Sequence, residues 1–160
     1  MKKALYTGSF DPVTIGHLDI IGRASKLFDL TVGVVDNPQK KGLFTLDERV
    51  DFIKESVADF GNVKVAEFSG LLADYIKEEG FDVVVRGLRG MSDFEYECNM
   101  SHMNDTLFPR GVETVFLMGR AEYAFICSSW VKEVASLHGK VEGLVPENVR
   151  LALEKKYWRI

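Results

Sequence analysis

The chain has 160 residues, of which 46% are hydrophobic, and a formal net charge of −4. This length fits one domain, since domains most often contain about 100–150 residues, so we expect residues 1–160 to form a single domain. The acidic balance gives no reason to expect a nucleic-acid or membrane partner, because such partners attract basic surfaces. No apolar run reaches the ~18 residues of a membrane span, and the first residues lack the apolar stretch of a signal peptide. We therefore expect a cytoplasmic protein, with Cys98 and Cys127 as free thiols.

Apolar runs rich in β-branched residues alternate with amphipathic stretches along the chain. In chain order, the patterns predict a strand at 4–6, a helix at 17–28, a strand at 30–35, a helix at 45–58, a strand at 63–68, a helix at 71–79, a strand at 82–86, a helix at 92–107, a strand at 112–118, a helix at 128–137 and a last helix from Pro146 to the tail Tyr157-Trp158. This alternation is typical of an α/β fold, here a Rossmann-like open and mainly parallel sheet with helices on both faces. In such sheets, ligands bind beyond the carboxyl ends of the strands.

Three of the predicted helices begin with residues that favour capping. Thr45 with Glu48, and Ser92 with Glu95, have the spacing of a capping box, in which a hydroxyl and a carboxylate accept hydrogen bonds from backbone N–H groups at the helix start. The Ser128 hydroxyl is expected to cap the helix that begins there.

The string TGSFDPVTIGH at residues 7–17 follows the first predicted strand directly. Its glycines allow the backbone to approach a ligand closely, and the Asp11-Pro12 pair favours a turn. Because the first amides of a helix bind anions, we expect Ser9 and His17 to contact a phosphate group at this helix start. The alternative is an ordinary turn with a capping or packed histidine. The position of the whole string after the first strand favours the phosphate site.

Other strand ends carry cationic or hydroxyl groups that bind anions. Lys40 and Lys41 follow the second strand, Arg86 ends the fourth, and Arg89 lies three residues later. Arginine binds phosphate through paired N–H groups, and lysine acts as a mobile charge. The serine pair at 128–129 adds hydroxyls and amides at a helix start. Each of these residues alone is explained as a solvated side chain or a helix cap. Together they predict a cationic rim around one cleft.

The two common nucleotide fingerprints, G-x-x-x-x-G-K-[ST] and G-x-G-x-x-G, are absent from the sequence. The string at 7–17 instead resembles the [ST]-x-G-x-[FL]-x-P-x-x-x-G-H signature of the nucleotidyltransferase superfamily. A narrower resemblance, to bacterial phosphopantetheine adenylyltransferases, covers essentially the whole chain. It is carried by RGLR at 86–89 followed by DFEYE at 93–97, together with the lysine pair before FTL at 44–46, HMN at 102–104 and the serines at 128–129.

The resemblance implies a nucleotidyltransferase-type fold and a specific reaction. ATP and 4′-phosphopantetheine would give dephospho-coenzyme A and pyrophosphate, by direct in-line attack without a covalent intermediate. It also implies Mg²⁺ as cofactor without protein metal ligands, feedback binding of coenzyme A, and a homohexamer built as a dimer of trimers.

The resemblance also implies roles for individual residues. His17, Ser9 and Lys40 would be catalytic. ATP would contact Ser9, Phe10, His17, Gly87, Leu88, Arg89, Glu97, Tyr123, Ala124, Phe125, Ile126, Cys127, Ser128 and Ser129. The acceptor would contact Ser9, Lys40, Leu72 and Arg86. The chain departs from the family pattern at Ser9, where many members have threonine, and at Cys127, where a serine is common.

Two further classes of function share parts of this pattern. Sister nucleotidyltransferases, such as cytidylyltransferases acting on glycerol phosphate or choline phosphate and nicotinamide mononucleotide adenylyltransferases, share the first motif. A regulatory module that binds ATP or coenzyme A without chemistry would not need the Ser9, His17 and Lys40 set. His102 is expected to be structural, and His138 to lie at a helix end.

Overall fold

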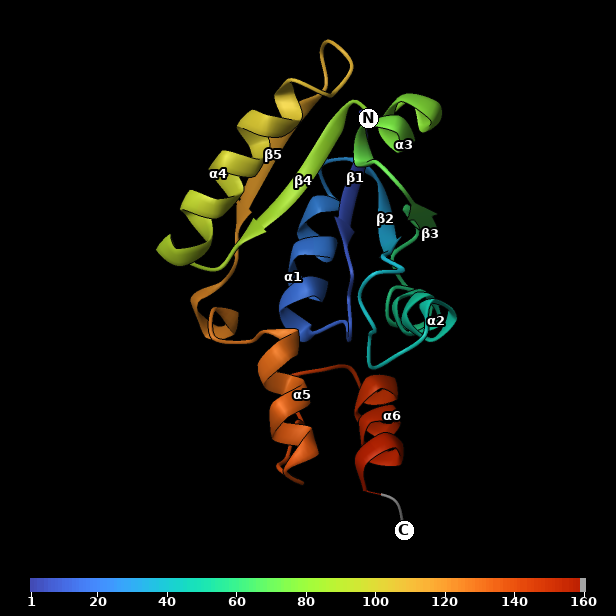
Figure 1. Cartoon of the computed structure of the whole chain (residues 1–160), viewed down its shortest axis with the longest axis vertical. Helices are drawn as coiled ribbons and strands as arrows, with labels where there is room; N and C mark the ends of the chain where they lie inside the picture. The colour runs from blue at the N-terminus through green and yellow to red at the C-terminus, as the bar shows by residue number, and fades with distance from the viewer. Residues whose placement is uncertain (159–160) are drawn as a thin grey trace.

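The structure, a computed structural model, describes residues 1–158. Its elements are β1 (Lys3–Gly8), α1 (Ile15–Ala24), β2 (Asp29–Asp36), α2 (Leu46–Ser56), β3 (Val63–Ser69), α3 (Leu72–Glu79), β4 (Val83–Leu88), α4 (Met91–Asp105), β5 (Glu113–Met118), the 3₁₀ turn η1 (Ala121–Tyr123), α5 (Ser128–Ser136) and α6 (Glu147–Tyr157). The strands form one sheet in the order β3-β2-β1-β4-β5, and every pairing in it is parallel (Figure 1). The predicted Rossmann-like α/β architecture is confirmed.

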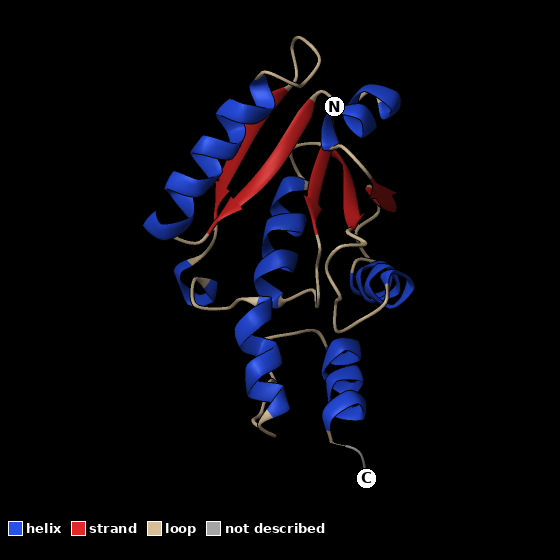
Figure 2. Cartoon of the chain, in the orientation of Figure 1, coloured by secondary structure: helices blue, strands red, loops and turns tan. Residues whose placement is uncertain are grey.

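Alternate residues of β1 and β4 enter two cores on opposite faces of the sheet. Figure 2 shows the strands of this sheet flanked by helices. The larger core joins Tyr6 and Val32 of the strands to Ile21 of α1 and Ile53 of α2. A smaller core on the other face contains Leu5, Val84 and Phe81 with Ile76 of α3. This in-and-out alternation follows from the two-residue period of a strand.

Helices α5 and α6 extend the molecule past the carboxyl ends of the strands (Figure 1). Their apolar sides belong to the larger core through Val131 and Ala135 of α5 and Val149 and Leu153 of α6. The start of α5 is thereby brought to the same edge of the sheet as the loops that follow β1, β2 and β4. Over residues 1–158, no helix combines the length and apolar character needed to cross a bilayer.

Of the three predicted helix caps, one is confirmed and two are wrong. The Thr45 hydroxyl accepts from the Glu48 N–H at 3.2 Å, and Glu48 accepts from the Thr45 N–H at 2.8 Å. The box expected at Ser92 does not form, because α4 begins after Gly90 without a side-chain cap. Cys127 precedes α5 in place of a serine cap.

The bounds of two elements also differ from the sequence prediction in ways that affect the site. Helix α1 begins at Ile15, after the cap Thr14, and ends at Ala24 instead of residue 28. Strand β4 continues past its predicted end at residue 86 through Gly87 to Leu88, because both residues pair with β5.

The two predicted capping boxes give a matched pair of variants. We expect Thr45→Ala to lower the free energy of unfolding by about 1 kcal/mol, the usual effect of losing a helix cap. Ser92→Ala should change it by less than about 0.5 kcal/mol, as for most surface substitutions. Urea denaturation followed by circular dichroism measures both. Equal losses in the two variants would contradict the capping assignment.

Candidate active site

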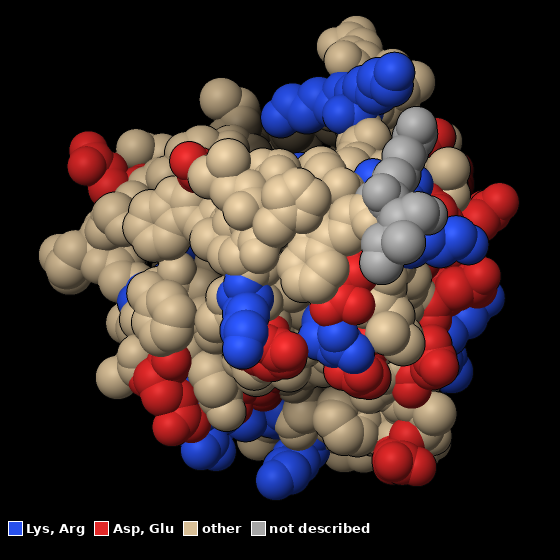
Figure 3. Space-filling view, turned by 90° about the horizontal axis from the view of Figure 1, so that it is seen from below, with Lys and Arg blue, Asp and Glu red and all other residues tan. Residues whose placement is uncertain are grey.

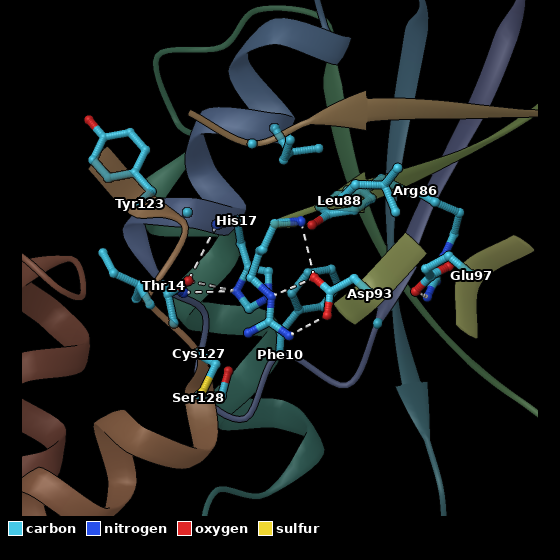
Figure 4. A pocket seen from close by; sticks show the side chains of 18 of the residues that line it. Phe10, Thr14, His17, Arg86, Leu88, Asp93, Glu97, Tyr123, Cys127 and Ser128 are labelled. Carbon is cyan, nitrogen blue, oxygen red and sulfur yellow. Dashed lines mark hydrogen bonds and ion pairs between the residues drawn. The ribbon is translucent and has the colours of Figure 1, made fainter. Parts of the chain in front are cut away.

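A cavity of about 400 Å³ opens at the carboxyl edge of the sheet, beyond β1 and β4 (Figure 4). Small-molecule sites commonly enclose about 300–1,000 Å³. Thirteen of the residues implied as site residues line it: Ser9, Phe10, His17, Arg86, Gly87, Leu88, Arg89, Glu97, Tyr123, Ile126, Cys127, Ser128 and Ser129. Residues from four separate stretches of the sequence therefore face one space.

A second cavity, of about 410 Å³, adjoins the first. Ser9, Ser128 and Ser129 line both, so these three residues form the boundary between them. The predicted Lys40 and the neighbouring Lys41 line the second cavity. The structure thus places the lysine loop beside the space that contains the imidazole and the two guanidinium groups, an arrangement suited to two phosphate-bearing molecules.

Three residues implied by the resemblance line neither cavity in the described structure. Leu72 begins α3 and packs partly buried against the smaller core. Ala124 and Phe125 follow η1, and the Phe125 side chain is exposed. Ligand contacts for these residues stay predictions.

His17 is the third residue of α1, and its ring is fixed by a reciprocal capping box with Thr14. The Thr14 N–H donates to His17 Nδ1 at 3.0 Å, while the His17 N–H donates to the Thr14 hydroxyl at 3.3 Å. Because Nδ1 accepts a hydrogen bond from a backbone N–H, the neutral ring carries its own proton on Nε2. Burial, and secondly the charge of Arg89, lower the pKa of His17 to about 4. At neutral pH the side chain is therefore an uncharged N–H donor.

Both arginines predicted to bind phosphate are paired with carboxylates of α4. Arg86 donates through Nε and Nη2 to Glu97, each at 2.7 Å, and through Nη1 to the Thr7 carbonyl at 3.2 Å. Arg89 donates through Nε and Nη2 to Asp93 at 2.9 and 3.1 Å. A guanidinium has five N–H donors, so each arginine keeps donors for an anion while its plane is held by α4.

Asp93 also bonds to the backbone just before α4. Its carboxylate accepts the Arg89 N–H at 3.0 Å in addition to the guanidinium, and these bonds lower the pKa of Asp93. The i, i+4 spacing to Arg89 was the available sequence signal for this pair. Ser92 lies inside the first turn of α4, which begins at Met91, and is therefore not at the cap position.

Several further cavity residues are not singled out by the sequence patterns. Tyr6, Thr7, Thr14, Tyr96 and Gly119 also line the first cavity, and Asp11, Val35, Asn37, Gly42, Arg49 and Lys132 line the second. The Thr7 hydroxyl is buried and has no hydrogen-bond partner among residues 1–158. Tyr6 lies beneath Phe10 with ring centroids 5.5 Å apart, and burial raises the pKa of its phenol.

The loop between β1 and α1 is anchored by side chains from other elements. Arg49 of α2 donates through Nη1 to the Ser9 carbonyl at 2.7 Å and to the Val35 carbonyl at 3.0 Å. The Ser128 hydroxyl, which does not cap α5, donates to the Pro12 carbonyl at 2.8 Å. These contacts join the strand-one motif to α2 and α5.

Charges of the two signs are not segregated on the face of the molecule formed by the α5 and α6 end. Seen from the end at which α5 and α6 lie, basic and acidic side chains are interspersed among uncharged ones (Figure 3). The cationic character of the site is therefore local, as expected for an anion site on a chain of net charge −4.

Comparison with known proteins identifies the class to which this fold and site belong. A profile of the cytidylyltransferase-like family matches residues 5–134, which places the chain among these nucleotidyltransferases. A phosphopantetheine adenylyltransferase of Clostridium kluyveri is 57% identical over 158 residues, covering 98% of this chain and 96% of the relative. Proteins of the same name from Carboxydothermus hydrogenoformans and Clostridium novyi are each 52% identical, over 98% and 93% of this chain and 97% and 92% of their own. The chain belongs to the phosphopantetheine adenylyltransferase family, and the resemblance found in its residues is confirmed.

The environment of His17 predicts an unusual titration. We expect its pKa to be about 4, below the ordinary value of 6.5. Between these values the unfolded chain binds more protons than the folded one, so this residue makes the free energy of unfolding decrease as the pH falls from 6.5 to 4. The imidazole Cε1–H resonance, assigned with His17→Asn, reports the titration by NMR. A midpoint near 6.5 would contradict the described environment.

Proposed function

We propose that the chain transfers the adenylyl group of ATP to 4′-phosphopantetheine, forming dephospho-coenzyme A and releasing pyrophosphate. The observation that carries this proposal is the pair of adjoining cavities. One contains His17, Arg86 and Arg89, the other contains Lys40, and Ser9 lies between them. The names of the 52–57% identical relatives supply the acceptor.

The reaction needs no nucleophilic side chain in this proposal. The acceptor phosphate is largely ionised at neutral pH, so one of its oxygens attacks the α-phosphorus of ATP directly. The bond from that phosphorus to the leaving pyrophosphate breaks as the new P–O bond forms. Catalysis then depends on holding two anions in line and on donors directed at the charge that develops.

The donors are assigned by where they lie. His17 Nε2–H and the Ser9 hydroxyl contact the α-phosphate, because both residues line the first cavity and Ser9 also lines the second. A neutral donor suits this position, since it needs no proton exchange during the reaction. Lys40 of the second cavity holds the acceptor phosphate together with Arg86, a role that the family resemblance gives to this residue of the first cavity. Arg89 with the amides at the start of α5 holds the nucleotide phosphates.

Mg²⁺ enters the proposal as part of the nucleotide substrate. Asp11, Asp93 and Glu97, the carboxylates that line the cavities, already accept from amides, Lys132 or arginines. Within residues 1–158, no group of three or more potential metal ligands is present. The ion is therefore expected on the ATP phosphates, where Mg²⁺ usually keeps water and phosphate ligands.

We also propose a cytoplasmic homohexamer that binds coenzyme A as a feedback ligand. Helix α4 supports an assembly, because it buries none of its residues in a single chain and exposes Phe94, Met100 and Met103. Coenzyme A contains the pantetheine and adenine parts of the product, so it can enter the same two cavities.

The acceptor is tested by a direct assay. Mixing the protein with Mg²⁺, ATP and 4′-phosphopantetheine should release pyrophosphate and give dephospho-coenzyme A in the mass spectrum. Glycerol phosphate, choline phosphate and nicotinamide mononucleotide, the acceptors of sister enzymes, should give none, and CTP should not replace ATP. Nucleotide binding without pyrophosphate release from any acceptor would instead favour the regulatory module.

Removal of the His17 donor tests the proposed chemistry. We expect His17→Ala to lower kcat roughly 10²- to 10³-fold, the usual loss for one preorganised donor, with the circular dichroism spectrum unchanged. His17→Asn keeps a neutral N–H donor on a shorter side chain and should lose less. A normal kcat in His17→Ala would exclude the imidazole from the reaction.

A further inference from the structure

Asp11 has more partners than a turn residue requires. Its side chain is largely buried, with the residue only 8% exposed. Oδ2 accepts the Leu43 N–H at 2.8 Å, and Oδ1 accepts the Phe44 N–H at 2.9 Å. The Lys132 ammonium of α5 donates to Oδ2 at 3.1 Å. One carboxylate thus connects the β1–α1 loop, the segment before α2, and α5.

The segment that Asp11 binds carries Lys40. Near its beginning, the Asn37 side chain accepts the Gln39 N–H at 3.1 Å, and the Asn37 carbonyl accepts the Lys40 N–H at 3.0 Å. The far end is held by the two bonds to Asp11. Lys40 therefore lies on a short bridge, 37–44, which is exposed over residues 37–42 and has hydrogen bonds at both ends.

Close packing leaves little freedom at the Asp11 end of this bridge. A Cβ atom on Gly42 would lie 3.1 Å from both Asp11 Oδ2 and the Phe44 carbonyl oxygen. Glycine at this position permits the carboxylate to approach the backbone. The carboxylate itself is anchored, since Arg49 holds the carbonyl of Ser9 and Ser128 holds that of Pro12.

We propose that Asp11 is a positioning residue: it sets where the Lys40 ammonium stands in the second cavity, and Lys132 is its counterion. This rests on the proposed function, in which Lys40 binds the acceptor phosphate. The carboxylate of Asp11 is needed because both of its oxygens accept hydrogen bonds, whereas an asparagine side chain has one accepting oxygen and one donating NH₂ group. Asp11→Asn therefore leaves an amide of the bridge facing a second donor.

A double-mutant cycle separates positioning of Lys40 from a general structural effect. We expect Asp11→Asn to lower kcat/KM for 4′-phosphopantetheine roughly 10- to 100-fold, because small misplacements of a binding group cost up to about 100-fold, and to leave the KM for ATP unchanged. In a Lys40→Ala background, Asp11→Asn should cause little further decrease in kcat/KM for 4′-phosphopantetheine. Asp47→Asn, an identical change on an exposed residue nearby, should leave all constants unchanged.

Several kinetic outcomes would overturn the proposal. An undiminished effect of Asp11→Asn in the Lys40→Ala background would show that Asp11 does not act through Lys40. Equal changes in the KM of both substrates would indicate a general structural role. If Asp11→Asn does not fold, Lys132→Gln replaces it in the cycle, because this substitution removes the counterion and leaves the carboxylate. The decrease in kcat/KM for 4′-phosphopantetheine should then be smaller, and it should again disappear in the Lys40→Ala background.

Hydrogen exchange tests the anchoring without any reaction. The amides of Leu43 and Phe44 should exchange faster in Asp11→Asn than in the unchanged protein and in Asp47→Asn. Unchanged protection of both amides would end the proposal. If the unchanged protein releases no pyrophosphate, the proposed function is wrong, and so is the role of Lys40 in binding the acceptor. Hydrogen exchange would still show whether Asp11 orders the bridge 37–44.

Discussion

The anchoring of the loop between β1 and α1 is the constraint on which the site depends. At the end of β1 and in the loop beyond it, backbone carbonyls need donors from outside the sheet. Those donors are side chains from three elements: Arg86 of β4 at Thr7, Arg49 of α2 at Ser9, and Ser128 of α5 at Pro12. The loop is therefore placed by the rest of the fold, and Ser9 and His17 are placed with it.

This arrangement couples the stability of the fold to the geometry of the site. Arg86, Arg49 and Ser128 anchor the loop and also line the cavities. Replacing any of them removes a cavity group and, at the same time, leaves a backbone carbonyl without its donor, which has its own cost. Loss of activity in such a variant does not identify ligand contact, whereas effects specific to one substrate do.

The sequence contains the fold in patterns that are local, and it contains the site only in part. Strand and helix alternation and the Thr45 box depend on neighbouring residues, so they are predictable. The hydrogen bond of the Ser128 hydroxyl is not predictable in this way, because its partner Pro12 lies 116 residues away. The bonds from Leu43 and Phe44 to Asp11 span 32 and 33 residues, also beyond the reach of any local pattern, so the sequence indicated only a turn at Asp11. Family resemblance supplied ligand roles for cavity residues, but nothing about how the loops that carry them are held.

The two cavities attract anions by different means. In the first, the charges of Arg86 and Arg89 are balanced by Glu97 and Asp93, and His17 is neutral. Its attraction for phosphate comes mainly from oriented N–H and hydroxyl donors and from the amides at a helix start. In the second, Lys40, Lys41 and Arg49 have no carboxylate within ion-pair distance among the residues that the structure describes, so a net positive charge remains. A nucleotide that arrives with Mg²⁺ needs donors more than charge, whereas an acceptor phosphate without a metal needs a cation. This division of charge supports binding of the nucleotide in the first cavity and of the acceptor phosphate towards the second.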